Sequence, residues 1–197
     1  MKNSKIKPSY NRAVVMVHGL SEYCIVKYIK SNLRITIEAH GEKNGRRSIQ
    51  ITGLKTIFNS STFKNLNGFL KKYECEISKE NGMKVMKNFK LFIIMDTDDC
   101  TCDEKEAFLN KSMFGDHWLY DYIITIANIT NLEDVMMKCG IPIDEKSDYI
   151  KIFPINRKDS DVKQIENLNE LLKKNERITN MSLLTRYCLD LYNEKVL

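Results

Sequence analysis

The chain has 197 residues, of which 43% are hydrophobic and 29% charged, and its formal net charge at pH 7 is +5. These values exclude a largely disordered or collagen-like chain and are typical of a globular domain with a proper core. The mild positive charge is compatible with a polyanionic partner but does not require one. No apolar run approaches the ~20 residues needed to cross a bilayer, and the basic N-terminus lacks the apolar core of a signal peptide.

The first half of the chain alternates between strand and helix patterns. Residues 13–17 are wholly apolar, as expected for a strand that is buried on both faces of a parallel sheet. In chain order, the sequence then predicts a helix with Ser21 as its N-cap, a strand at 34–39, a basic loop at 40–47, and two helices between 49 and 73 that are interrupted near 59–61.

The second half continues the alternation. The sequence predicts a strand at 89–95, a short helix at 103–110, a strand at 120–127, a helix at 131–139 capped by Asn131, a fifth strand at 149–153, and two helices from 161 onward. This order predicts an α/β fold with a mostly parallel central sheet flanked by helices. The expected division is an N-terminal tail (1–11), an α/β domain (12–155) and a helical C-terminal cap (156–197).

Six cysteines are spread along the chain, and several lie in apolar segments, where a reduced thiol packs as a small hydrophobic group. Cys100 and Cys102 are separated by one residue, whereas zinc sites commonly have two between them, and no matching Cys or His pair follows. We therefore expect a cytoplasmic protein with reduced cysteines and no structural zinc.

The strand at 89–95 runs directly into a cluster of carboxylates, Asp96, Asp98 and Asp99. Because side chains alternate along a strand, we expect Asp96 and Asp98 to point to the same side. Two negative charges ~4 Å apart repel by about 4 kcal/mol at an effective dielectric near 20. The fold must therefore place a cation there, share a proton, or leave the strand end in water. Mg²⁺ and Mn²⁺ favour such ligands, but Asp is also a common turn residue.

Polar residues follow two other predicted strands. His18 to Glu22 come after the first strand, and Asn131 to Asp134 come after the fourth. Ligand sites of parallel α/β sheets lie at the carboxyl ends of the strands. We therefore expect the three polar clusters to meet at one edge of the sheet.

An apolar strand that closes on Gly-x-x-Glu, with an Asp-x-Asp strand end further along, resembles the TOPRIM domain. This domain occurs in bacterial primases, topoisomerases, small RNA-processing nucleases and OLD-type nucleases. The likeness covers roughly residues 12–155, and the matching positions are Gly19, Glu22, Asp96, Asp98 and Glu133. It implies a divalent-metal-dependent nuclease that hydrolyses DNA or RNA phosphodiesters with Mg²⁺ or Mn²⁺.

The resemblance also implies a role for each acidic residue. Asp96 and Asp98 would hold one ion with Glu22 nearby, while Glu133 and Asp99 would help to position a second ion. For Glu133 a structural explanation competes, because the helix dipole favours a glutamate in the first turn of a helix.

One position departs from the family pattern, because His18 stands where the family has its first glutamate, a metal ligand or general base. A neutral imidazole binds transition metals and would favour Mn²⁺ over Mg²⁺. Three interpretations stay open. His18 replaces the glutamate as a catalytic residue, catalysis depends on Glu22 instead, or the site is degenerate. In the last case the protein is a catalytically weak metal- or nucleotide-binding module or a regulatory subunit.

Four basic residues, Lys43, Arg46, Arg47 and Lys55, are expected to line the path of the nucleic-acid backbone. The chain has no Walker loop and no dinucleotide-binding glycine motif, which argues against an ATPase or an NAD enzyme. By resemblance to stand-alone OLD-type proteins, the chain would be an antiphage defence effector that works with a separate ATPase subunit. A homo-oligomer and a primase-like or RNA-maturation enzyme stay open as further interpretations.

Overall fold

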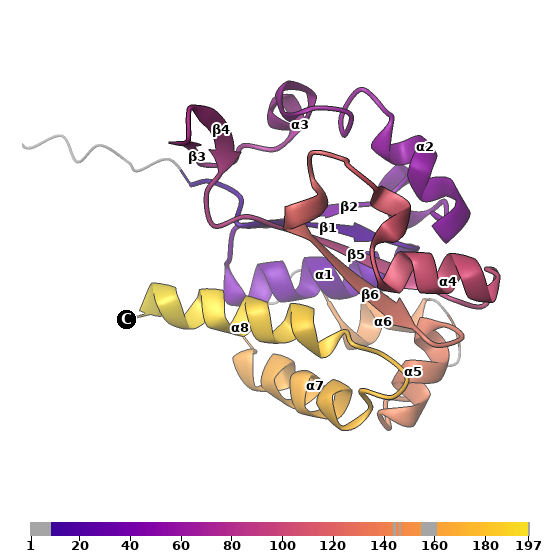
Figure 1. Ribbon diagram of the computed structural model, residues 1–197. Coiled ribbons are helices and arrows are strands. Elements are labelled where there is room, and N and C mark those ends of the chain that lie inside the picture. Colours follow the sequence, from indigo (N-terminus) through magenta and orange to yellow (C-terminus); the bar gives the residue numbers. More distant parts are fainter. Residues whose placement is uncertain (1–8, 144, 146, 155–160, 197) are drawn as a thin grey trace, which may run out of the picture.

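The computed structural model describes residues 9–143, 145, 147–154 and 161–196. Its centre is a four-stranded, all-parallel sheet with the strand order β2-β1-β5-β6 (Figure 1). The strands are β1 (Ala13–Val17), β2 (Ile37–His40), β5 (Lys90–Asp96) and β6 (Ile123–Asn128). The predicted α/β fold with a parallel sheet flanked by helices is confirmed.

The apolar strand β1 is buried on both faces, which explains its uninterrupted run of apolar residues. Val15 and Val17 belong to the core on one side of the sheet, whereas Val14 and Met16 belong to the core on the other side. All four side chains are fully buried. A central strand of a three-layer fold has no solvent-facing side, so its sequence does not alternate between apolar and polar residues.

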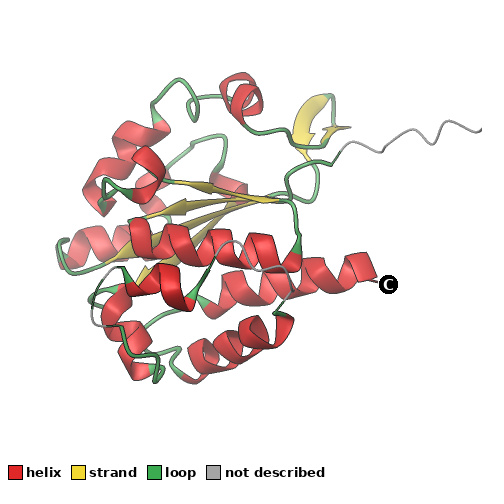
Figure 2. Ribbon diagram, turned by 180° about the vertical axis from the view of Figure 1, so that it is seen from behind, coloured by secondary structure: helices red, strands yellow, loops and turns green. Residues whose placement is uncertain are grey.

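In the described part of the chain, five helices cover one face of the sheet (Figures 1 and 2). They are α1 (Leu20–Leu33), α5 (Leu132–Lys138), α6 (Asp148–Ile152), α7 (Val162–Lys174) and α8 (Ser182–Val196). The predicted helical C-terminal segment is confirmed, and it shares the core of the sheet: Leu168 and Leu184 pack in the same apolar cluster as Phe92 of β5.

The opposite face carries shorter helices, α2 (Leu54–Phe58), α3 (Leu66–Lys72) and α4 (Cys102–Leu109) (Figure 1). Single 3₁₀ turns lie at Lys43–Gly45, Ile51–Gly53, Ser112–Phe114 and Tyr120–Tyr122. A hairpin that the sequence analysis did not predict joins β3 (Ile77–Glu80) to β4 (Met83–Met86). Its turn residues Asn81 and Gly82 both have positive φ, which is the backbone geometry that favours an Asn-Gly pair in a two-residue hairpin turn.

The predicted fifth strand at 149–153 is wrong, because this segment forms helix α6. Tyr149 and Phe153 are four residues apart and their rings stack at 6.2 Å, while Ile150 between them is 55% exposed. The spacing of buried residues is helical, but five residues are too few for the sequence pattern to distinguish the two periods. Ser21 is also not the N-cap of its helix, because Gly19 occupies that position.

The connection between α7 and α8 runs along the outer edge of β6. The backbone amide of Ile129 donates to the carbonyl of Ile178 (2.7 Å), and Thr179 forms an antiparallel bridge with Asn128. The Asn180 side chain accepts from the amide of Ala127 (2.9 Å). This segment therefore covers one edge of the sheet, while β2 forms the other edge. Within the described residues, no helix is both long and apolar enough to cross a membrane.

Candidate acidic site at the carboxyl edge of the sheet

Three strands end in polar residues at the same edge of the sheet. His18 directly follows β1, Asp96 is the last residue of β5, and Asn128 is the last residue of β6. Asp96 and Asn128 are register partners in the parallel pair of strands. All four strands of the central sheet run in one direction, so their carboxyl ends lie at the same edge, as predicted from the sequence.

Asp96 is buried and is held by a short hydrogen-bonded chain. The Asn128 amide donates to Oδ1 of Asp96 (2.9 Å), and the Thr179 hydroxyl donates to the amide oxygen of Asn128 (2.8 Å). The bond from Thr179 identifies the oxygen of the Asn128 amide and turns its nitrogen toward the aspartate. On the other side, Nε2 of His18 lies 3.8 Å from Oδ2 of Asp96. Nδ1 of His18 is buried and has no hydrogen-bond partner within the described residues.

Two glutamates approach Asp96 from the starts of helices. Glu22 is 1% exposed, and its Oε2 accepts from the backbone amide of Gly19 (2.9 Å). Glu133 lies in the first turn of α5, and its Oε1 accepts from the Ser21 hydroxyl (3.1 Å). Both positions suit a carboxylate, because helix N-termini present free amides and a positive dipole end.

The pKa shifts of the acids show that they lie close together. The pKa of Glu22 is raised to about 8, first by burial and then by the negative charge of Asp96, with a smaller contribution from Glu133. The pKa of Asp96 is raised to about 6, first by burial, while Glu133 and Asp98 raise it further and Asn128 and His18 oppose the rise. Burial and like charges both disfavour the ionised form of a carboxyl group. A cation bound among these carboxyls would reverse both effects.

The structure places Asp98 and Asp99 differently from Asp96. Both are exposed, and β5 ends at Asp96, so the alternation of side chains that predicted a common direction for Asp96 and Asp98 does not extend to Asp98. The amide of Thr97 donates to the carbonyls of Asn128 and Thr130, which fixes the backbone directly after the end of β5. Asp98 therefore adds negative charge near Asp96 from the solvent side.

Four residues at this site were not identified from the sequence, namely Asn128, Thr179, Tyr149 and, as a hydrogen-bond donor, Ser21. The pKa of Tyr149 is raised, first by burial and then by the charges of Glu133, Glu22 and Asp96, which places its hydroxyl beside the acids. A signal did exist for Asn128, since it is a polar residue at the carboxyl end of a strand. Thr179 carries no local signal.

The basic loop lies beside the start of α1. Gly45 has a φ of +83°, and a Cβ atom there would lie 2.8 Å from the carbonyl oxygen of Gly19 and 3.0 Å from Cα of Leu20, so only glycine fits. The amide of Ile49 also donates to the carbonyl of His18 (2.8 Å). These contacts tie the loop to the candidate site.

The four predicted basic residues all lie on the surface. Lys43 and Arg46 flank Gly45 in the tied loop, and Arg47 forms an ion pair with Glu42 (3.1 Å). Lys55 is in helix α2, further along the chain. The loop that carries Lys43 and Arg46 therefore contacts the start of α1 through its backbone.

The donor set of the site consists of carboxylate oxygens and one imidazole, which suits Mg²⁺ or Mn²⁺. In the part of the chain that the structure describes, no three His, Cys, Asp or Glu side chains are grouped closely enough to hold an ion. Each acid instead accepts a hydrogen bond from the protein: Glu22 from Gly19, Asp96 from Asn128 and Glu133 from Ser21. An ion would have to draw the carboxyls closer together than they stand here.

We expect the raised pKa of Glu22 to make the protein less stable at alkaline pH. A carboxyl whose pKa is higher in the folded state stabilises that state while protonated, so this stabilisation is lost as the pH rises from about 4.5 through about 8. The free energy of unfolding should fall by a few kcal/mol between pH 5 and pH 9, at about 1.4 kcal/mol per unit of pKa shift. Urea denaturation across this range, in the absence of divalent ions, measures the effect.

The matched variants are Glu22→Gln and Glu106→Gln. The first removes the titrating group and should flatten the pH dependence, whereas Glu106 is exposed on α4 and its substitution should leave the slope unchanged. An equal slope in wild type and Glu22→Gln would show that Glu22 does not titrate in this way.

Comparison of the chain with protein-family models, curated proteins and solved structures finds no match. The likeness to the TOPRIM domain therefore depends on the motif residues themselves. Of these, Glu22, Asp96 and Glu133 converge at one edge of a parallel sheet, next to His18 and to the loop that carries Lys43 and Arg46.

Proposed function

We propose that the protein is a TOPRIM-like, divalent-metal-dependent nuclease that hydrolyses phosphodiester bonds of DNA or RNA. The observation that carries the proposal is the convergence of Glu22, Asp96 and Glu133 from three separate segments at the carboxyl edge of the sheet. Within the described residues, none of the three forms an ion pair with a lysine or arginine. Carboxyl groups that lie close together oppose one another's ionisation, and a bound cation would compensate this repulsion.

Asp96 and Glu22 would hold the ion, with His18 and Glu133 as further donors. Asp98, which the resemblance assigns to the same ion as Asp96, is exposed and would reach that ion from the solvent side. Asp99 is also exposed and would help to position a second ion, as the resemblance implies. A divalent ion in such a site supplies a more acidic bound water and neutralises charge that develops on the phosphodiester.

The protein's own residues set the positions and protons of this site. Asn128, supported by Thr179, fixes the orientation of Asp96. Without a cation, Glu22 keeps its proton at neutral pH because its pKa is raised to about 8. A cation bound beside Glu22 would lower this pKa and release the proton, which frees the carboxylate to act as a ligand of the ion.

The basic loop, whose backbone packs against the start of α1, supports the proposal of a polyanionic substrate. Lys43 and Arg46 are exposed and lie on a loop held against Gly19, so phosphates on either side of the reacting bond can contact them. Lys55 would extend this path over α2. Contacts with phosphates do not distinguish bases, so this loop would bind DNA or RNA of any nucleotide sequence.

The cellular role that we propose follows from the same resemblance. The protein would act in the cytoplasm as an antiphage defence effector of the OLD type, with its ATPase supplied as a separate subunit. An adjacent ATPase gene, and co-purification of its product, would support this assignment.

A second function, a catalytically weak metal- or nucleotide-binding module, is favoured by two observations. No preformed three-ligand group occurs among the described residues, and His18 takes the place of the family's glutamate. Such a module would use the acidic edge to bind an ion or nucleotide and regulate a partner.

A cleavage assay separates the two functions. Supercoiled plasmid, single-stranded DNA and tRNA are each incubated with Mg²⁺, with Mn²⁺ and with a chelator, while Mn²⁺ binding is measured by electron paramagnetic resonance. A nuclease cleaves at least one substrate with a divalent ion and none with the chelator. Binding of Mn²⁺ without any cleavage supports the module, whereas absence of Mn²⁺ binding contradicts the nuclease and the metal-binding form of the module.

We expect His18→Glu to preserve or raise Mg²⁺-dependent cleavage, by up to about tenfold, because a carboxylate is a better Mg²⁺ ligand than an imidazole. The ratio of the rates with Mg²⁺ and Mn²⁺ is the quantity to measure. His117→Gln is the control, since His117 lies beside Phe58 on the opposite layer. If His18→Glu is folded by circular dichroism but inactive with both ions, the assignment of His18 is wrong.

A further inference from the structure

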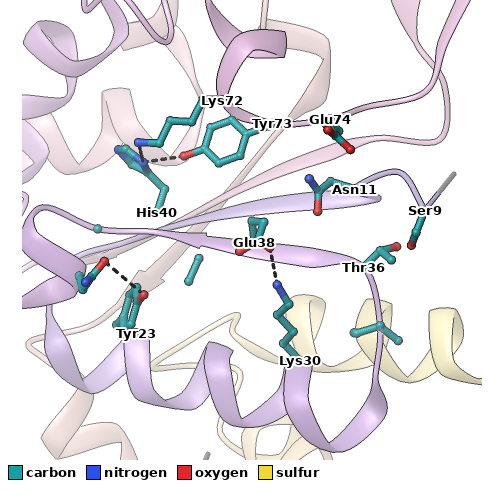
Figure 3. A pocket seen from close by; sticks show the side chains of 14 residues that line it. Ser9, Asn11, Tyr23, Lys30, Thr36, Glu38, His40, Lys72, Tyr73 and Glu74 are labelled. Atoms are coloured by element: carbon teal, nitrogen blue, oxygen red, sulfur yellow. Dashed lines mark hydrogen bonds and ion pairs between the residues drawn. The ribbon is translucent and has the colours of Figure 1, made fainter.

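A pocket of about 650 Å³ lies along the free edge strand β2 (Figure 3). Its walls come from β2, from α1 and from the segment that follows α3. None of the residues of the acidic site lines it. The side chains that face it include His40, Lys72, Tyr73, Glu38 and Lys30.

The polar centre of this pocket is His40. Its Nδ1 lies 2.7 Å from the Tyr73 hydroxyl and 3.3 Å from the ammonium of Lys72. Because a lysine ammonium can only donate, we assign Nδ1 as the acceptor of a neutral ring that carries its hydrogen on Nε2. The ring packs edge-on against Phe63, with a centroid distance of 4.9 Å, which holds it in place.

Lys72 brings a positive charge that its neighbours do not balance. Within the described residues it forms no ion pair, and its ammonium lies 5.5 Å from the centre of the Tyr73 ring. Lys72 is exposed to solvent, and partial burial lowers its pKa. Burial and then the charge of Lys72 lower the pKa of His40 to about 4. A bound anion would oppose both shifts, because a nearby negative charge favours the protonated forms.

The acidic residues of the pocket offset this charge only in part. Glu38 forms an ion pair with Lys30. Burial and then the charge of Glu38 raise the pKa of Tyr73. Glu74 lies at the other end of the pocket, beside Asn11 (Figure 3). At the end formed by His40 and Lys72, the ammonium of Lys72 is therefore a cation without an ion pair among the described residues.

We propose that this end of the pocket binds a phosphate group, with Lys72 as the counter-ion and His40 as a neutral donor. Asn44 and Gly41 of the basic loop border the same pocket, and the Tyr23 hydroxyl donates to Asn44. The volume greatly exceeds that of a phosphate and leaves room for a nucleoside. The pocket thus continues the phosphate-binding surface of the basic loop toward β2.

A free nucleotide and a nucleic-acid strand both carry this chemistry. The inference is independent of cleavage at the acidic cluster, because neither His40 nor Lys72 contacts that cluster. The two proposals can therefore fail separately, provided that phosphate binding is measured without divalent ions.

The test is a nuclear magnetic resonance titration in the presence of a chelator. The sequence has three histidines, so the imidazole signals are readily assigned. The probes are inorganic phosphate, a 5′-mononucleotide and a four-nucleotide single strand. We expect a saturable change of the His40 signals and a rise in the pH midpoint of its titration, because a nearby negative charge favours the protonated ring.

Lys72→Met should weaken binding by about tenfold or more, the loss of one charge-assisted contact. Lys71→Met is the matched control, since Lys71 is the exposed neighbour in the same helical turn and does not line the pocket. Binding of phosphate or the mononucleotide identifies a nucleotide pocket, and binding of the strand alone identifies a path for nucleic acid. The inference is overturned if no probe changes the His40 signals, or if Lys72→Met binds like wild type.

Discussion

Asp96→Asn should lower the rate of metal-dependent cleavage by at least about a hundredfold. Substitution of a residue that only hydrogen-bonds to a metal ligand typically lowers metal affinity or activity by about tenfold to a hundredfold. Asp96 is itself the central carboxyl of the proposed site, so its loss should cost more. The substitution keeps the shape of the side chain and an oxygen that can accept from Asn128, so the fold should be retained. Single-turnover cleavage at saturating Mn²⁺ measures the chemical step.

The control for this variant is Asp190→Asn. Asp190 has the same residue type but is exposed in α8 and belongs to no proposed site, so we expect no change in the cleavage rate. Mn²⁺ affinity should fall in Asp96→Asn and not in Asp190→Asn. Wild-type cleavage by Asp96→Asn would remove the acidic edge from the mechanism.

Leu184→Ala should destabilise the protein by about 2–5 kcal/mol, the usual cost of truncating a fully buried leucine. Leu184 lies in α8, is fully buried, and belongs to the same apolar cluster as the central strands. The loss should appear as a shift of a single cooperative unfolding transition, measured with urea, because α8 has no separate core.

Its neighbour Leu183 provides the control, since it is 46% exposed in the same helix. Leu183→Ala should change the free energy of unfolding by no more than about 0.5 kcal/mol. Two separate transitions in Leu184→Ala would instead mean that the C-terminal helices fold as an independent unit.

The parallel sheet could be predicted because strands that are buried on both faces have uninterrupted runs of apolar residues, as in β1 and β5. The limits of the edge elements were less accurate. β2 begins at Ile37 and not at residue 34, because Arg34 adopts a left-handed conformation (φ 50°) after α1. β6 begins at Ile123 because the three residues before it form a 3₁₀ turn. Tyrosines favour strands in isolation, and the tertiary structure overrides this preference.

The acidic site could be predicted in part, for a similar reason. His18, Glu22, Asp96 and Glu133 follow strands or begin helices, so the strand order of a parallel sheet alone brings them together. The polar partners of Asp96 could not all be predicted. Thr179 reaches Asn128 only because the connection after α7 returns to the edge of β6, and nothing in the local sequence encodes that return.

Residues 178–180 pair with the edge of β6, and this pairing couples local unfolding of the segment to the acidic site. Local unfolding of this stretch would break the contact between Thr179 and Asn128 and expose an unpaired strand edge at the same moment. Exposure of this sheet edge and misorientation of Asp96 would then be a single event. Amide hydrogen exchange at Ile129 should report it directly, since that amide is bonded to Ile178.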